Sequence, residues 1–258
     1  MKIRVLPPLG RPLPLDTCPR TDTVEKLADL LDDKHVIHVR GTPSSGKTTL
    51  ASLLWMYYQE RGHRVVFVPY WIDVKDPHEF LAQLCELAGI TGVNSSNILS
   101  RDDIIFIVDE AQSSYGDNLF WLQIVKYQSS RHCGPKICLF ASYGSPITGS
   151  PTTGHPNPGH QTIPFRSTPV KLGPLQRVSL TVSKIATTPD VCLFYNQEEF
   201  EDVLKRLCSR TWSTCDFSSN AGTYLYSITN GHPGAVSTLM SYVYTVCVPC
   251  LRSSHLRY

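Results

Sequence analysis

The feature that most constrains this chain is the segment GTPSSGKT at Gly41–Thr48. An apolar run at His35–Val39 precedes it, and apolar residues at helical spacing follow it. The segment fits the pattern G-x-x-x-x-G-K-[ST], in which a glycine-bounded loop joins a strand to a helix. Glycine has no Cβ, so the backbone can fold closely around phosphate oxygens. The sequence therefore predicts a phosphate-binding loop at this position.

The residues of this loop have predicted roles toward a nucleoside triphosphate. Successive backbone N–H groups and the N-terminus of the following helix would face the phosphates. Lys47 would reach the β- and γ-phosphates, and the Thr48 hydroxyl would be a ligand of Mg²⁺. No N/T-K-x-D signature of a guanine pocket is present, so ATP is the predicted nucleotide. The predicted nucleotide-binding residues of the loop are Gly41, Thr42, Pro43, Ser44, Ser45, Gly46, Lys47, Thr48 and Thr49.

A second motif, which is acidic, completes the predicted site: IIFIVDE at Ile104–Glu110. Its apolar residues form a buried strand, which places Asp109 at the carboxyl edge of a sheet, where ligands bind in open α/β folds. Asp109 is a predicted Mg²⁺ ligand. Glu110 can polarise a water for attack on the γ-phosphate, so we predict Glu110 and Lys47 as catalytic residues. The alternative for Glu110 is an ordinary exposed acid.

Apolar strand-length segments alternate with helical patterns through the first three quarters of the chain. This alternation predicts an α/β fold, with a parallel P-loop NTPase sheet of about five strands flanked by helices. The predicted strands are His35–Val39, Arg64–Tyr70, Asp103–Glu110, Lys136–Ser142 and a short one near Val170–Leu172.

The chain is predicted to comprise three parts. Residues 1–20 are proline-rich and are predicted to be extended. Residues 21–190 form the predicted P-loop core, including a flexible loop at 145–165 that is dense in Pro, Gly, Ser and Thr. Residues 191–258 form a predicted helical lid lobe. The first predicted helix of this lobe begins at Asn196, and Glu199 completes its capping box. Two more helices are predicted at Ser219–Thr229 and Pro233–Tyr244.

Composition narrows the predicted partners and location. The net charge is +2, which identifies no partner by itself. No Asp or Glu occurs from Asn118 to Pro189, which indicates either a surface facing a polyanion or a basic stretch neutralised by acids elsewhere in the fold. No apolar run is long enough to span a membrane, so no membrane partner is predicted. The odd count of nine cysteines, scattered through apolar segments, suits buried free thiols in a reducing compartment, so an intracellular location is predicted.

The strand Arg64–Val68 between the loop strand and the D-E pair makes the chain resemble the P-loop branch that includes AAA+ and STAND ATPases. In that branch the next strand ends in a polar sensor, for which Ser142 is the candidate. Gly231–Pro233 is similar to the G-x-P turn of STAND lids, and the resemblance implies that Pro233 contacts the nucleotide base. The arginine that AAA+ lids carry after this turn is absent, because Ala235 and Val236 stand there.

A wider set of segments resembles the P-loop module of fungal crinkler-type and retrotransposon-hot-spot-like proteins. The resemblance spans Cys18 to Tyr244 and includes CPRTDTVEKLADLL, VDEAQ, LGPLQRVSLT, FYNQEEFEDVLKRL and TNGHPGAV. It implies a nucleotide-driven module of an effector or selfish-element protein, which would act in the cytosol or nucleus, including delivery to a host cell. The leucine-phenylalanine-leucine header and the nuclease-like domain of such proteins are not visible in this sequence.

Four functions remain open at this point. The first is an ATP-hydrolysing conformational switch, and the second is a nucleotide-binding regulatory module with little or no hydrolysis. A small-molecule kinase is disfavoured because the 145–165 loop contains no arginine. A DNA-directed motor would use the basic stretch, and a protein partner is the alternative to nucleic acid. In an oligomer, Arg166 or Arg131 would be candidates to reach a neighbour's γ-phosphate, and the alternative is that both are surface residues.

Overall fold

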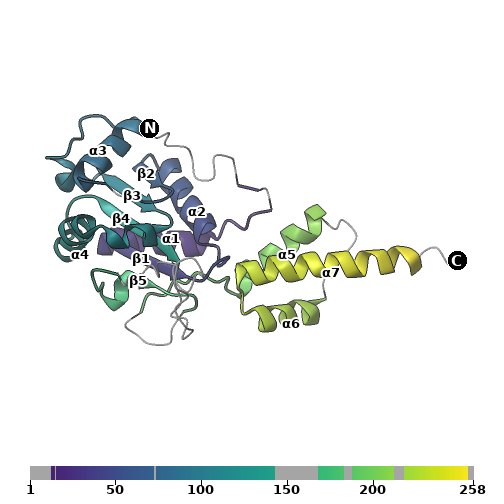
Figure 1. Cartoon of the computed structure of the whole chain (residues 1–258). Coiled ribbons are helices and arrows are strands. Elements are labelled where there is room, and N and C mark those ends of the chain that lie inside the picture. Colours follow the sequence, from purple (N-terminus) through teal and green to yellow (C-terminus); the bar gives the residue numbers. More distant parts are fainter. Residues whose placement is uncertain are drawn as a thin grey trace, which may run out of the picture. The chain divides into compact units, whose positions relative to one another are not determined.

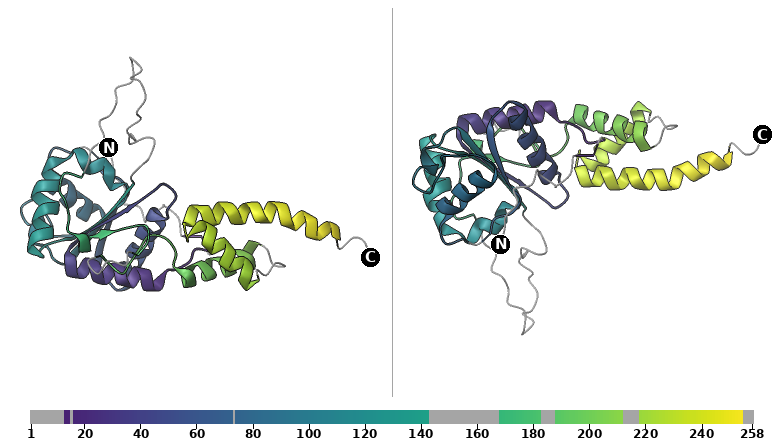
Figure 2. Two further views of the ribbon diagram at one scale, coloured as in Figure 1. Left: turned by 90° about the horizontal axis from the view of Figure 1, so that it is seen from below. Right: turned by 90° about the horizontal axis from the view of Figure 1, so that it is seen from above.

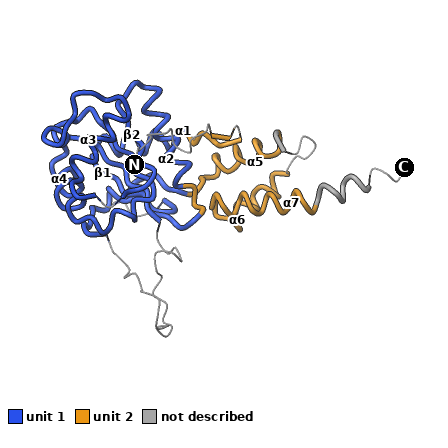
Figure 3. Tube along the Cα trace, turned by 45° about the horizontal axis from the view of Figure 1, so that its top comes forward, with its two compact units in different colours: residues 1–12, 21–43, 47–193 blue, residues 13–20, 44–46, 194–258 orange. Residues whose placement is uncertain are grey.

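The computed structural model describes residues 13–14, 16–72, 74–142, 168–182, 188–211 and 218–254. The chain is organised as two compact units (Figure 3). The core unit includes Thr21–Pro43 and Lys47–Leu193, and the C-terminal unit includes Leu13–Arg20, Ser44–Gly46 and Phe194–Tyr258. The predicted flexible loop at 145–165 and most of the predicted extended segment 1–20 lie outside the described residues.

The core unit is built on a five-stranded sheet with the order β2-β3-β4-β1-β5 (Figure 1). The strands are β1 (Val36–Gly41), β2 (Arg64–Val68), β3 (Ile104–Val108), β4 (Lys136–Ser142) and β5 (Arg177–Val178). Every pair of neighbouring strands is parallel. The predicted parallel α/β sheet of about five strands is therefore confirmed. Because β4 lies between β1 and β3, the carboxyl ends of all three strands share one edge.

Helices cover both faces of this sheet (Figure 2). α1 (Thr21–Lys34) and α2 (Lys47–Glu60) pack on one face, and their leucines at helical spacing are fully buried. α3 (Pro77–Leu87), a π-helical segment (Phe120–Val125) and α4 (Lys126–Arg131) supply the other face. Strand side chains alternate between the two layers, which explains why the strands are almost continuously apolar.

An aromatic cluster anchors the layer on the α3 side. The Trp71 ring stacks on Phe120 with centroids 4.0 Å apart, and Phe80 meets Trp71 edge-on at 5.1 Å. Asp76 is the N-cap of α3, because its side chain accepts the N–H groups of His78 and Glu79. These contacts fix the segment after β2 against the segment after β3, which carries the acidic motif.

The predicted fifth strand is wrong in position. Residues 170–172 form no strand, and the fifth strand is the two-residue β5, paired with His38 and Val39 of β1. Leu172 is instead buried in the core cluster from an irregular segment. Its apolar character reflects burial in this core, which needs no strand at that position.

The C-terminal unit contains α5 (Gln197–Thr211), α6 (Ser219–Thr229) and α7 (Pro233–Ser254). The predicted capping box is present: the Asn196 side chain accepts the Glu199 N–H at 2.8 Å, and the Glu199 carboxylate accepts the Asn196 N–H at 3.2 Å. The core of this unit comprises Cys18, Phe200, Val203, Leu204, Leu225, Val236 and Met240.

A buried ion pair joins the segment Leu13–Arg20 to α5 within this unit. The Arg20 guanidinium lies 3.1 Å from the Glu199 carboxylate and donates to the Phe194 carbonyl at 3.1 Å.

The α7 helix continues beyond the predicted end at Tyr244. Among the described residues, no helix combines the length and apolar character needed to cross a membrane.

Candidate functional site

The phosphate-binding loop joins the end of β1 to the start of α2, as predicted from its sequence. Ser44 and Gly46 adopt left-handed backbone conformations, with φ of 59° and 85°. Gly46 has a second constraint, because a Cβ at this position would lie 3.1 Å from Cγ of Pro233. The glycine therefore provides both the backbone conformation and the close approach of a neighbouring segment.

Lys47 lies at the first position of α2 and is 6% exposed. Its Nζ donates to the Thr42 carbonyl at 2.7 Å and to the Gly41 carbonyl at 3.4 Å. Burial lowers the pKa of Lys47, while the charges of Glu110 and then Asp109 act in the opposite direction. The ammonium is thus folded back onto its own loop, within electrostatic reach of both acids.

Asp109 follows β3 and is 4% exposed. Its N–H donates to the Val68 carbonyl at 2.8 Å, which extends the β2–β3 pairing by one residue. Burial raises the pKa of the Asp109 carboxyl. A hydrogen bond from the Thr48 side chain and another from the Glu110 N–H oppose this rise. The loop and the acidic motif therefore meet at the carboxyl edge of the sheet.

This arrangement fits a Mg²⁺-bound triphosphate. Burial shifts the pKa of both Lys47 and Asp109 toward the neutral form, so each charge lacks full compensation in the protein alone. A triphosphate would compensate the ammonium, and a cation would compensate the carboxylate. The Thr48 hydroxyl and the Asp109 carboxylate are the hard oxygen ligands that Mg²⁺ prefers.

Glu110 is exposed and has a left-handed backbone with φ of 48°. Its carbonyl accepts the Ser113 N–H at 3.0 Å and the Ser113 hydroxyl at 2.7 Å. Its carboxylate accepts a hydrogen bond from the side-chain amide of Gln112. The amide oxygen of Gln112, Oε1, accepts the backbone N–H of Ser142 at 2.8 Å. Sequence reasoning missed Gln112, and the only available signal was its place in the VDEAQ segment.

The middle of the phosphate-binding loop, Ser44–Gly46, is part of the C-terminal unit. Within this unit the Gly234 N–H donates to the Ser44 carbonyl at 2.9 Å. A Cβ on Gly234 would lie 2.6 Å from the Ser44 Cβ. The turn that contains Pro233 therefore packs directly on these loop residues, and no side chain larger than hydrogen fits at Gly234.

The remaining predicted site residues are described by their burial and their position in the fold. Thr49 is half-buried in the first turn of α2, Pro43 is exposed, and Ser45 is fully buried. Arg131 ends α4 just before β4 begins, so it lies toward the amino edge of the sheet, opposite the acidic motif. Arg166 lies outside the described residues.

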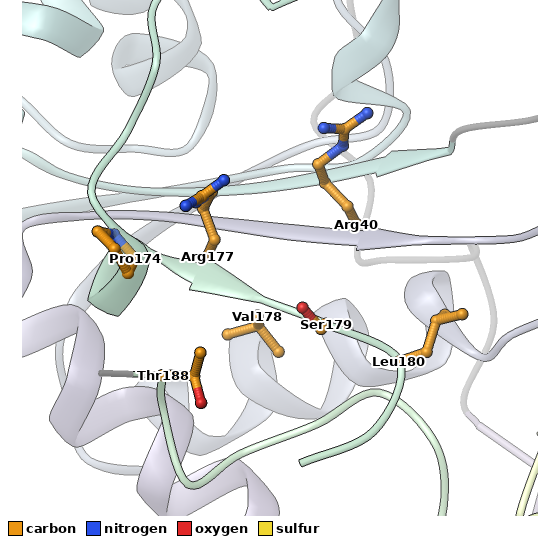
Figure 4. A pocket seen from close by; sticks show the side chains of 7 residues that line it. All are labelled: Arg40, Pro174, Arg177, Val178, Ser179, Leu180 and Thr188. Carbon is orange, nitrogen blue, oxygen red and sulfur yellow. The ribbon is translucent and has the colours of Figure 1, made fainter. Parts of the chain in front are cut away.

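A separate pocket lies at the β5 edge of the sheet (Figure 4). Arg40 and Arg177 point to the same side of the sheet there, and Val178 points to the other. The pocket has a volume of about 340 Å³, and its described lining contains no acidic residue. Arg177 belongs to the acid-free stretch Asn118–Pro189, whose role as a polyanion-facing surface remains a prediction. The lining residues are Arg40, Pro174, Arg177, Val178, Ser179, Leu180 and Thr188.

Comparison with known proteins finds a family match over the N-terminal part of the chain. Residues 19–86 match the family model described as novel STAND NTPase 3. Solved structures of RuvB from Thermotoga maritima align over 88% of this chain and 63% of their own, with 16% identity and a TM-score of 0.39. A Walker-type ATPase from Pyrococcus abyssi aligns over 91% of this chain and 69% of its own, with 15% identity and a TM-score of 0.42.

The chain thus spans less than two thirds of the RuvB chain. A search of curated proteins finds no match. The family match covers α1, β1, the phosphate-binding loop, α2, β2 and most of α3, and it does not extend to the acidic motif. The resemblance to crinkler-type proteins has no counterpart among these findings. From its strand order, its loop and the family match, the chain has the P-loop NTPase fold, and its N-terminal part is similar to STAND NTPases.

Proposed function

We propose that this chain binds ATP with Mg²⁺ and hydrolyses it to ADP and phosphate, as a conformational switch or motor module. The observation that carries this proposal is the buried Asp109 carboxylate, hydrogen-bonded by Thr48 and within electrostatic reach of Lys47. Three residues from two separated segments thus converge at the end of a glycine-bounded loop. A structural turn would have no need to bury an acid and a lysine together.

The loop residues bind and orient the triphosphate in this proposal. Backbone N–H groups of Gly41–Thr48 and the N-terminus of α2 face the phosphate oxygens. Lys47 exchanges its carbonyl partners at Thr42 and Gly41 for the β- and γ-phosphates, which compensates a charge that is now only partly satisfied. Pro233 is the proposed contact to the base. Ser142 is the proposed polar sensor near the γ-phosphate.

Thr48 and Asp109 are the residues that would hold Mg²⁺. When bound, the ion neutralises negative charge on the phosphates as the terminal bond breaks. Glu110, the exposed residue beside Asp109, orients the attacking water and accepts its proton.

The second candidate function is a nucleotide-binding regulatory module that rarely or never hydrolyses ATP. One observation favours it: the Glu110 carboxylate is already engaged by the Gln112 amide. In such a module, ATP would act only by stabilising the conformation that binds it more tightly.

Phosphate release from Mg-ATP separates the two functions. We expect Glu110→Gln to lower the rate by about 10²-fold or more, the range of general-base catalysis, while ATP still stabilises the variant against heat. Glu86→Gln, a change at an exposed acid on α3, should keep the wild-type rate. Equal rates in the wild type and Glu110→Gln would reject hydrolysis and leave the binding module. No thermal stabilisation of the wild type by Mg-ATP would reject both.

A further inference from the structure

Gln112 joins the ends of two neighbouring strands. It lies in the 3-10 turn Ala111–Gly116, which follows β3 and Glu110. Its Nε2 donates to the Glu110 carboxylate, and its Oε1 accepts the backbone N–H of Ser142 at 2.8 Å. Ser142 ends β4, the strand that pairs with β3 in the sheet. One half-buried side chain therefore connects the proposed catalytic acid to the adjacent strand end.

The two partners fix the orientation of the Gln112 amide. A backbone N–H can only donate, so the Ser142 N–H must meet the amide oxygen. A carboxylate can only accept, so Glu110 must meet the amide nitrogen. A flipped amide would lose both hydrogen bonds. No side chain other than one with a donor and an acceptor at this length satisfies both partners.

The backbone of Glu110 is already held by other contacts. Its carbonyl accepts two hydrogen bonds from Ser113, whose hydroxyl also accepts the Trp71 N–H at 3.0 Å. The freedom that remains to Glu110 lies in its side-chain torsions. The Gln112 amide removes much of that freedom by holding one carboxylate oxygen, Oε2.

We infer that Gln112 is a positioning residue, which holds Oε2 of Glu110 and leaves Oε1 directed at the attacking water. The inference rests on the proposed hydrolysis and adds a residue to it. Among the described residues Gln112 makes no hydrogen bond to the phosphate-binding loop or to Asp109, and it meets Ser142 only at the backbone N–H, so we expect it to act on turnover and not on nucleotide affinity. Loss of such an orienting partner typically lowers activity by about 10- to 100-fold.

The test compares Gln112→Met with the wild type. Methionine keeps the length and bulk of the side chain and removes both hydrogen bonds. We expect the kcat for ATP hydrolysis to fall by about 10- to 100-fold with the Kd for ATP unchanged, while loss of the hydrogen bond to the Ser142 N–H lowers the melting temperature by only a few degrees. Gln83→Ala is the matched control, because Gln83 also donates to a carboxylate, that of Glu79 on the surface of α3. It should hydrolyse ATP at the wild-type rate.

A double-mutant cycle shows whether Gln112 acts through Glu110. In a Glu110→Gln background, Gln112→Met should cause no further loss of kcat. A further loss of the same size, a wild-type kcat in Gln112→Met, or a loss of ATP affinity in its place would each overturn the inference while the proposed hydrolysis stands. If the wild type binds ATP but releases phosphate no faster than Glu110→Gln, the proposed function fails, and the inference fails with it.

Discussion

Substitution of His38 tests the burial of the strand that carries the phosphate-binding loop. His38 lies in β1 and is 2% exposed. Its Nε2 lies 3.2 Å from the Tyr115 hydroxyl, and its ring meets Trp121 edge-on at 6.0 Å. Burial, reinforced by the positive charges of Arg40 and Arg177, lowers the pKa of His38 to about 3. The folded protein therefore keeps this imidazole neutral over the whole mildly acidic range.

The sign of the pH dependence follows from proton linkage. An unfolded histidine has a pKa of about 6.5, so between this value and about 3 the unfolded chain binds more protons than the folded chain. The free energy of unfolding therefore falls as the pH drops below about 6.5, and the loss grows until the folded pKa is reached. Between pH 7 and pH 5, the His38 contribution amounts to about 2 kcal/mol.

The assay is urea unfolding of the wild type, His38→Gln and His63→Gln at these two pH values. Glutamine does not titrate, and its amide can still hydrogen-bond to Tyr115. His63 is exposed, so its variant should behave as the wild type does. Other titrating groups cancel in the comparison, so His38→Gln should lose about 2 kcal/mol less than either between pH 7 and pH 5. The same loss in all three proteins would refute the burial of His38 against Tyr115 and Trp121.

Two further substitutions test the loop and the C-terminal unit. At about 100 times its Kd, Mg-ATP should raise the melting temperature of the wild type by about 5–11 °C in a thermal scan, and the surface variant Lys126→Ala should show the same rise. Lys47→Ala should show no rise. An equal rise in Lys47→Ala would contradict the proposed phosphate contact. Gly231→Ala should destabilise the C-terminal unit by about 1–3 kcal/mol in urea unfolding, because φ is +71° and a Cβ would overlap the Tyr195 carbonyl oxygen. Gly222→Ala in α6, where a Cβ would lie 3.6 Å from its nearest neighbour Leu204, should be neutral or stabilising, and equal losses in both would count against the strained turn.

The local patterns of the sequence determined most of the elements at the site. The phosphate-binding loop, the cap at Asp76 and the capping box of Asn196 and Glu199 depend on residues within one or two turns of each other. The run Ile104–Val108 is apolar at every position, so its burial and its end at Asp109 follow from composition alone. Such features can be predicted because their physical causes lie inside a short window of the chain.

Only the tertiary structure decided which of these segments became neighbours. β4 entered the sheet between β1 and β3, and this brought Ser142 to Gln112 across a separation of 30 residues. The fifth strand formed at Arg177–Val178 and not at Val170–Leu172, where Leu172 is buried in the core cluster from an irregular segment. The contact of Ser44–Gly46 with the turn at Pro233 and Gly234, which includes the hydrogen bond from the Gly234 N–H to the Ser44 carbonyl, likewise joins distant segments. Pairing and packing between distant segments follow from how the whole core fills its volume, which no local pattern contains.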